Sequence, residues 1–317
     1  MSEAEATVDK SASARPSPLT VWAQASRIWT LTLAGIGVLV GTAAAVYYGF
    51  GFSLERFILA DLGAIALQAA TNMINDYYDY VQGIDQFDEL SQERIGPGMA
   101  IQHGLVSPDQ LWWGAIAAFA FGSILGLILV YQCGWVILVI GILSVATGYF
   151  YTAPPISIAY HGLGDLAVFL FMGPGFVLGG YYVQVFSFSW GALAAAIPMG
   201  CLAAGVLEVN NMRDIENDRR HGKHTFAAII GRPAAVAELI GTDALAFAVV
   251  ILGAVTGVLP WSAVAVLLTA PRAFKQIRLV RTATDWRNMN EALNLTAQFH
   301  LEFGLLLTAA LLAGRML

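Results

Sequence analysis

Residues 57–80 read FILADLGAIALQAATNMINDYYDY, and this stretch decides the fold class. It is mostly apolar as far as Thr71 and then carries Asn72, Asn75, Asp76 and Asp79 in quick succession. About 20 apolar residues are needed to cross the ~30 Å hydrocarbon layer of a membrane. The stretch therefore predicts a transmembrane helix with a polar cluster at one end, where carboxylates usually mark a functional site.

The composition supports a membrane location for the whole chain. Of its 317 residues, 57% are hydrophobic and 12% are charged, whereas about a quarter of the residues in a soluble domain are charged. Apolar windows long enough to span occur at 28–50, 57–80, 110–131, 134–152, 164–184, 190–212, 234–258, 260–280 and 294–314. We therefore predict an all-α membrane protein with nine transmembrane helices, of which the eighth is interrupted early by Pro271, Arg272 and Lys275.

The distribution of lysine and arginine predicts the orientation. With nine spans and a cytoplasmic amino terminus, 14 of the 16 basic residues fall on the cytoplasmic side, and only Arg56 and Arg315 fall outside. This asymmetry is the pattern that the positive-inside rule describes. Residues 1–26, rich in Ser, Ala, Thr and Pro, are predicted to be a disordered polar tail, and residues 27–317 the transmembrane domain.

Two acidic clusters share one pattern and one predicted depth. Asn72, Asp76 and Asp79 lie at helical spacing and share a face, as do the corresponding residues of GVLEVNNMRDIENDRRHGKHT at 205–225. Facing each other, the clusters would form an oxygen-rich pocket, and Mg²⁺ binds through one or two carboxylates together with phosphate oxygens. The pattern favours a diphosphate held through Mg²⁺, with neighbouring cations balancing its charge. Helix caps or solvated loop residues are the alternative. The candidate metal and diphosphate residues are Asn72, Asn75, Asp76, Asp79, Asn210, Asn211, Asp214, Asp218, Arg213 and Lys223.

At these motifs the sequence resembles the UbiA superfamily of intramembrane prenyltransferases, and most of all its branch that prenylates 1,4-dihydroxy-2-naphthoate. Four stretches carry the likeness: NMINDYYDYVQGID at 72–85, ERIGPGMAIQHGLVSP at 93–108, YTAPPISIAYHGLGDLAVFLFMGPGFVLGGYYVQ at 151–184, and NNMRDIENDRRHGKHTFAAIIGR at 210–232. The resemblance implies nine helices around a central cavity, closed by loops on the cytoplasmic side. It also implies Mg²⁺ and polyprenyl diphosphate at the two motifs, with Arg94 and Lys223 beside the diphosphate.

The implied reaction is an electrophilic aromatic substitution with decarboxylation that gives demethylmenaquinone. Asp85 and Glu208 are the candidates for a general base, and Tyr151 is a candidate for contact with the acceptor, although tyrosine is also common at membrane interfaces. Phe169, Phe171, Met172 and Phe176, around the Gly173-Pro174-Gly175 break, are candidates for a prenyl groove or for ordinary helix packing.

The expected partners are a polyprenyl diphosphate, an aromatic acceptor and the lipid bilayer, with no nucleic acid. We expect a multi-pass protein of the cell membrane whose active site faces the cytoplasm. Two alternatives stay open at this stage: another prenyl acceptor, such as homogentisate, a chlorophyllide, haem or a lipid, and a cation-coupled transporter. Prenyl chain length and oligomeric state do not follow from the sequence.

Overall fold

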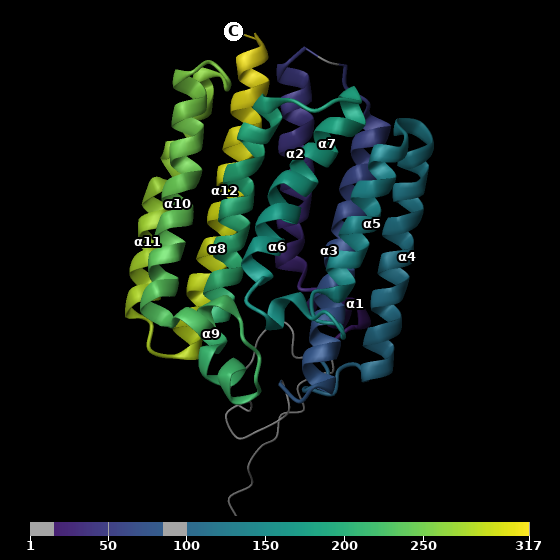
Figure 1. Ribbon diagram of the computed structural model, residues 1–317, viewed down its shortest axis with the longest axis vertical. Helices are drawn as coiled ribbons and strands as arrows, with labels where there is room; N and C mark the ends of the chain where they lie inside the picture. The colour runs from purple at the N-terminus through teal and green to yellow at the C-terminus, as the bar shows by residue number, and fades with distance from the viewer. Residues whose placement is uncertain (1–15, 50, 85–99, 317) are drawn as a thin grey trace, which may run out of the picture.

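The chain forms a bundle of helices that run side by side (Figure 1). The computed structural model describes residues 16–49, 51–84 and 100–316. Apart from a single β-bridge between His161 and His224, these residues contain no strand. In chain order the elements are α1 (Pro18–Ala25), η1 (Ile28–Thr30), α2 (Leu31–Tyr47), α3 (Leu54–Val81), α4 (Pro108–Cys133), α5 (Trp135–Phe150), η3 (Ile158–Tyr160), α6 (Gly164–Leu170), η4 (Phe171–Gly175), α7 (Phe176–Val185), α8 (Trp190–Arg220), α9 (Phe226–Ile230), α10 (Arg232–Val255), η5 (Trp261–Thr269), α11 (Ala270–Thr282) and α12 (Trp286–Met316).

Seven helices of the described residues are long and apolar enough to cross a membrane, fewer than the nine predicted. The fourth predicted span corresponds to α5, which is apolar but has only 16 residues. The eighth corresponds to the 3₁₀ helix η5 followed by α11, and the basic residues that begin at Arg272 lie in α11. These two segments therefore fall short of a continuous apolar helix of full length.

The segment predicted as a disordered tail is helical in part. Ser17 caps α1 by accepting a hydrogen bond from the backbone N–H of Thr20, and Pro18 occupies the first turn, where its missing N–H does no harm. Val21 and Ala25 of α1 are buried against a cluster formed mainly by α3 and α4. An apolar face thus orders this segment, while residues 1–15 lie outside the described part of the chain.

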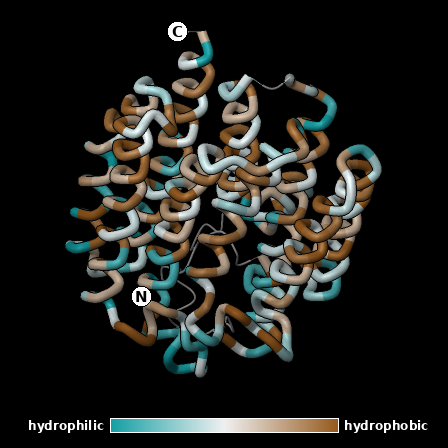
Figure 2. Tube along the Cα trace, turned by 45° about the horizontal axis from the view of Figure 1, so that its top comes forward, coloured by the Kyte–Doolittle hydropathy of each residue, from teal (hydrophilic) through white to brown (hydrophobic). Residues whose placement is uncertain are grey.

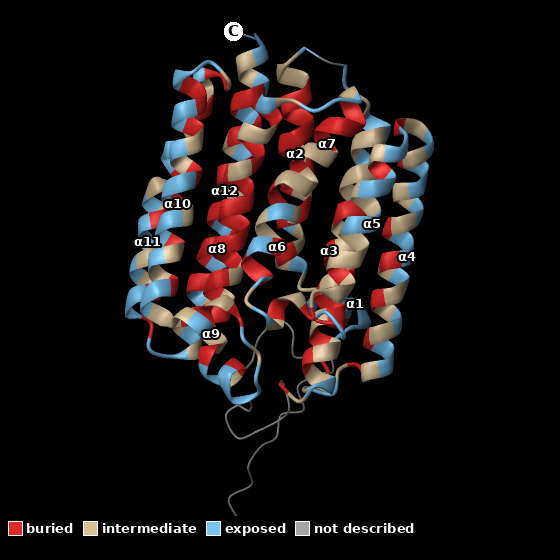
Figure 3. Cartoon of the chain, in the orientation of Figure 1, coloured by how far each residue is buried: buried red, intermediate tan, exposed pale blue. Residues whose placement is uncertain are grey.

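The centre of the bundle consists of α2, α8 and α12, whose apolar windows are mostly buried, whereas α4 and α10 lie at the periphery (Figure 3). Hydrophobic residues also cover the outward faces of the helices (Figure 2), as expected for a surface in contact with lipid. Helices α2 and α7 cross closely. A Cβ atom on Gly180 would lie 2.6 Å from the carbonyl oxygen of Val38, so only glycine fits there.

The two motif helices end at the same side of the bundle. Helix α3 has 28 residues and α8 has 31, which correspond to about 42 and 46 Å at 1.5 Å per residue. Both exceed the ~30 Å hydrocarbon thickness. Both run downwards in Figure 1, so that their carboxyl-terminal turns, which carry the acidic motifs, lie near each other at the lower end.

The fifth predicted span is broken at the predicted position. Helices α6 and α7 are joined by the π-helical turn η4, which contains Pro174. Proline lacks the N–H that a regular helix requires, and the wider turn accommodates it. Gly173 in this turn packs directly on α8, because a Cβ there would lie 2.6 Å from the Cα atom of Gly200.

Candidate active site

The first acidic motif, on α3, is buried and paired with cationic and phenolic groups. Asp76 and Asp79 are 2% and 4% exposed. The guanidinium of Arg27, which precedes η1, forms an ion pair with Asp76 and donates a hydrogen bond to the Asn75 Oδ1 atom at 3.2 Å. The Tyr160 hydroxyl donates to Asp79 Oδ1 at 2.5 Å, and the Asn75 amide donates to Asp79 Oδ2 at 3.2 Å.

The second acidic motif, on α8, is organised by Arg213. Its guanidinium donates to both carboxylate oxygens of Asp214, at 3.0 and 2.6 Å, and to Asn210 Oδ1 at 3.0 Å. A further bond to Asn290 Oδ1 at 2.8 Å and the ring of Trp286, 5.3 Å away, link the motif to α12. Arg213, predicted to bind diphosphate, thus holds the motif's own aspartate in this structure.

Lys223 joins the two motifs. Its ammonium nitrogen lies 2.9 Å from Asp79 Oδ2 on α3 and 4.0 Å from Asp218 Oδ1 on α8. The chain returns to this position because Gly222 adopts a left-handed conformation after α8, with φ of 71°, a common way to end a helix. Asp218 also accepts a hydrogen bond from Thr225 at 3.1 Å. The predicted meeting of the two clusters is therefore seen in the structure.

Five residues of this network were not among the predicted site residues: Arg27, Tyr160, Thr225, Trp286 and Asn290. Of these residues, only Arg27 could have been suspected from the sequence, because it is a basic residue at the beginning of an apolar span. Tyr160 and Thr225 lie in connections that meet only in the folded chain, at the bridge between His161 and His224.

A cavity of about 150 Å³ is lined by apolar residues and by polar residues of both motifs, and we call it the polar cavity. Asn72, Asn75, Asn210, Asn211 and Lys223, all predicted site residues, line it together with Arg27 and Tyr151. The Asn72 amide nitrogen donates to the Ser26 carbonyl at 2.9 Å and to the Thr30 hydroxyl at 2.8 Å. Its side chain is thereby fixed, with Oδ1 accepting from Gln68 at 3.3 Å.

Tyr151 enters the polar cavity from the end of α5. A phenol hydroxyl can donate a hydrogen bond, and the predicted contact with an acceptor would use this group.

A larger apolar cavity of about 550 Å³ lies between α3, α4, α5 and α7. Leu67, Ser144 and Phe176 line both cavities, so the apolar cavity adjoins the polar one. The apolar cavity also reaches the outer surface, because Leu127 and Ile142 in its lining are 58% and 59% exposed. Of the four residues predicted around the break in the fifth span, Phe176 lines both cavities and Phe171 and Met172 line the polar one.

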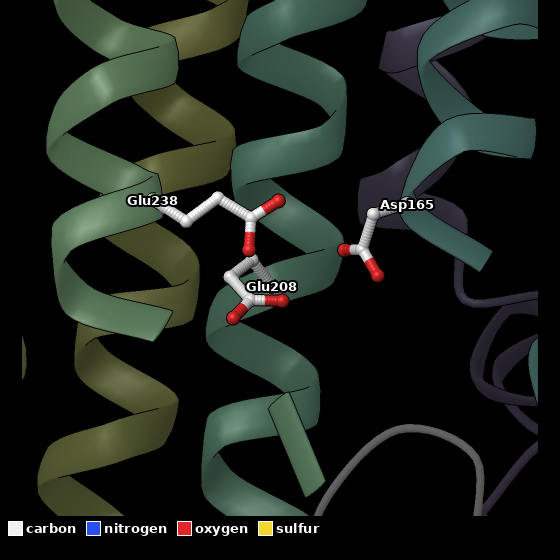
Figure 4. A group of neighbouring side chains, drawn as sticks. All are labelled: Asp165, Glu208 and Glu238. Atoms are coloured by element: carbon white, nitrogen blue, oxygen red, sulfur yellow. The ribbon is translucent and has the colours of Figure 1, made fainter. Parts of the chain in front are cut away.

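The remaining predicted residues lie elsewhere. Asp85 and Arg94 fall outside the described residues. Glu208 is not in the lining of either cavity. Its side chain turns towards Asp165 and Glu238 instead, as Figure 4 shows, so its position gives no support to a role as the general base.

The donor set of the two motifs suits Mg²⁺. Four buried or half-buried aspartates and several asparagine oxygens supply the hard ligands that this ion prefers. In the structure the aspartates are paired with Arg27, Arg213 and Lys223. A metal ion would take over the carboxylates from these cations.

Comparison with known proteins identifies the class to which this arrangement belongs. A bundle of membrane-spanning helices with paired Asn/Asp motifs beside an apolar cavity suits a lipid-modifying membrane enzyme. The model of the UbiA prenyltransferase family matches residues 26–298, and the chain belongs to this family. A 1,4-dihydroxy-2-naphthoate octaprenyltransferase from Bacillus subtilis is 33% identical over 291 residues, which cover 91% of each chain.

Solved structures agree on the fold. The apo structure of a UbiA homolog from Aeropyrum pernix K1 superimposes with a TM-score of 0.66 at 22% identity and covers 92% of this chain and 98% of that one. A UbiA homolog from Archaeoglobus fulgidus, bound to DMAPP and Mg²⁺, superimposes with a TM-score of 0.60 at 15% identity and covers 91% and 99%.

Proposed function

We propose that the chain transfers a polyprenyl group from an allylic diphosphate to 1,4-dihydroxy-2-naphthoate, with loss of CO₂. The observation that carries this proposal is the junction at Lys223, where the aspartates of α3 and α8 meet beside a polar cavity that adjoins an apolar one. A diphosphate with a hydrocarbon tail has this division of polar and apolar parts. The Bacillus subtilis relative, named for this reaction, supports the choice of acceptor.

Mg²⁺ would be held by Asp76, Asp79, Asp214 and Asp218 and would offset the negative charge of the diphosphate as it leaves. The Archaeoglobus fulgidus homolog, bound to DMAPP and Mg²⁺, supports this assignment. Arg27 and Lys223 line the polar cavity, so their cationic groups stabilise the developing charge of the leaving group. Asn72, Asn75, Asn210 and Asn211 orient the diphosphate from the same cavity.

The apolar cavity holds the prenyl tail. Its opening at Leu127 and Ile142 would let the tail extend towards lipid, and Phe176 and Leu67 stand where the tail passes into the polar cavity. Tyr151 donates a hydrogen bond to the acceptor. The buried surroundings keep water from the allylic cation, which would otherwise be hydrolysed.

The chemistry balances without a redox partner. The allylic C–O bond breaks with its electron pair leaving on the diphosphate, and a ring carbon of the acceptor forms the new C–C bond. If the attacked carbon carries the carboxylate, departure of CO₂ returns the electron pair to the ring and no base is required. The product of the transfer is the hydroquinone form of demethylmenaquinone.

We further propose nine membrane crossings, with α5 and the η5–α11 segment as the two short ones, and a cytoplasmic amino terminus. The clustering of basic residues next to the lower ends of α8 and α11 in Figure 1 supports this orientation. The active site then faces the cytoplasm from the cell membrane.

The test is turnover by the purified chain in lipid with 1,4-dihydroxy-2-naphthoate and an allylic diphosphate, with and without Mg²⁺, followed by mass spectrometry. A prenylated and decarboxylated product that forms only with Mg²⁺ is expected. Mg²⁺-dependent transfer to a different acceptor alone would refute the naphthoate assignment. Absence of transfer to every acceptor would refute the prenyl-transfer proposal for this chain.

A further inference from the structure

A second group of acidic side chains lies outside the proposed active site. Asp165 on α6, Glu208 on α8 and Glu238 on α10 place carboxylate oxygens within 4.8 Å of one another. Figure 4 shows the three side chains extending towards one another from separate helices. None of them lines the polar or the apolar cavity. We call these three residues the carboxylate cluster.

The carboxylate cluster is buried and lacks hydrogen-bond donors. Glu208 is 1% exposed and Asp165 is 7% exposed. Neither side-chain oxygen of Glu208 accepts a hydrogen bond from an N–H group or a hydroxyl of the described residues. Its hydrogen-bonding neighbours are the carboxyl groups of Asp165 and Glu238, and a hydrogen bond between two carboxyl groups requires a bound proton. Buried carboxylates normally accept several hydrogen bonds, so the oxygens of Glu208, aimed at the other two acids, indicate a missing partner.

Among the described residues, no lysine, arginine or histidine forms an ion pair with the carboxylate cluster. The ion pairs found among the described residues involve other acids, namely Asp76, Asp79, Asp214, Asp218 and Glu302. The ionisable groups that act on Glu208 are Asp165 and Glu238, which are both acidic. Unpaired buried charges are unfavourable by several kcal/mol each, so bound protons or a bound cation must neutralise them.

The ligand chemistry favours a hard metal ion. Carboxylate oxygens are the donors preferred by Mg²⁺, Ca²⁺ and Mn²⁺, whereas zinc sites usually contain nitrogen or sulfur ligands. Oxygens on opposite sides of such an ion are separated by twice the metal–oxygen distance, roughly 4–5 Å for Mg²⁺ and Ca²⁺. The mutual separation of up to 4.8 Å in the carboxylate cluster fits one ion.

We propose that Asp165, Glu208 and Glu238 bind one hard divalent cation that ties α6, α8 and α10 together. This site is separate from the Mg²⁺ proposed at the two aspartate motifs and does not depend on prenyl transfer. Its role is structural: the ion neutralises the buried acids and fixes α8, which carries the second motif, against its neighbours.

The test measures metal binding rather than turnover. The full chain in detergent is stripped with a chelator and titrated with Mn²⁺ alone, and bound Mn²⁺ is counted by electron paramagnetic resonance. Glu208→Gln is expected to bind one ion fewer than the unaltered chain, and Glu216→Gln, an exposed residue of the same helix, is expected to bind the same number. A double variant, Asp79→Asn with Asp218→Asn, distinguishes the two metal sites. It weakens the site at the aspartate motifs and leaves the carboxylate cluster intact.

Thermal unfolding provides a second readout. Mn²⁺ is expected to raise the midpoint for the Asp79→Asn, Asp218→Asn double variant, but not for the same double variant when it also carries Glu208→Gln. Glu238→Gln, at a half-buried position, replaces it if Glu208→Gln does not fold. The proposal would be overturned if the proteins with and without the Glu208 carboxylate bound equal amounts of Mn²⁺ and showed equal shifts of the unfolding midpoint. That result would mean that protons neutralise the carboxylate cluster.

Discussion

Replacement of Lys223 by methionine is expected to have opposite effects on metal binding and on prenyl transfer. The ammonium group of Lys223 lies 2.9 Å from Asp79 Oδ2 and 4.0 Å from Asp218 Oδ1, and the side chain is 12% exposed. A divalent ion reaches these two carboxylates only by displacing the ammonium. In the variant the carboxylates are left without that competitor, while the diphosphate loses a cationic contact.

The contacts of Lys223 with Asp79 and Asp218 determine how large the changes in Mn²⁺ affinity and in kcat should be. Unit charges 4 Å apart interact by about 4 kcal/mol at an effective dielectric constant of ~20, and desolvation offsets much of this energy. A hydrogen bond to a charged group contributes a net ~1.5–3 kcal/mol, which corresponds to about ten- to a hundredfold in affinity. Lys223→Met should therefore bind Mn²⁺ alone about that much more tightly. Loss of one preorganised donor should lower kcat by about 10²–10³-fold.

Both quantities are measurable on the same preparation. Mn²⁺ affinity is titrated by electron paramagnetic resonance in a Glu208→Gln background, so that the carboxylate cluster does not contribute, and prenyl transfer is followed by mass spectrometry. Lys275→Met, at an exposed position of α11, is the control and should change neither quantity. Unaltered or weaker Mn²⁺ binding by Lys223→Met would refute the proposed competition between the Lys223 ammonium and the metal ion. Normal turnover would refute the proposed contact between Lys223 and the diphosphate.

Three further outcomes follow from the geometry. Asp76→Ala or Asp214→Ala should lower product formation at least ~10³-fold while circular dichroism still reports a folded helical protein; near-normal turnover would refute the two-motif site. Ser144→Trp, which narrows the passage between the cavities, should slow transfer of long prenyl chains about tenfold or more relative to a five-carbon diphosphate in competition assays. Gly180→Ala should lower the free energy of unfolding by about 1–3 kcal/mol in detergent, whereas Gly179→Ala, which meets no atom within 4 Å, should not.

Local spacing was sufficient to predict the two motif helices. The fourfold repeat of Asn210, Asp214 and Asp218 predicts a shared face because neighbouring turns of a helix bring these positions together. The Gly173-Pro174-Gly175 break was predicted for an equally local reason, since proline cannot donate the hydrogen bond of a regular helix. Apolar length alone gave a less complete answer: α5 and η5–α11 lie where the fourth and eighth spans were predicted, but neither is a long, continuous apolar helix.

Contacts between distant segments could not be predicted in the same way. Arg27 and Asp76 are 49 residues apart and Tyr160 and Asp79 are 81 residues apart, so no helical period relates them. Glu208 illustrates the same limit. It was predicted as a candidate for the general base, but it lies two residues before Asn210. A shift of two residues turns a side chain through about 200° around a helix, and Glu208 faces Asp165 and Glu238 instead.

The charges of the candidate site also explain why metal and diphosphate have to bind together. Four carboxylates face three cations in the structure, from the pairs that Arg27, Arg213 and Lys223 make with the motif aspartates. The site without ligands is therefore close to neutral, as burial at the membrane requires. A divalent ion alone would displace cations that have no other anion to pair with, and a diphosphate alone would add negative charge beside four carboxylates. When both enter, the metal takes the aspartates and the released cations take the phosphate oxygens, so that each buried charge keeps a partner of opposite sign.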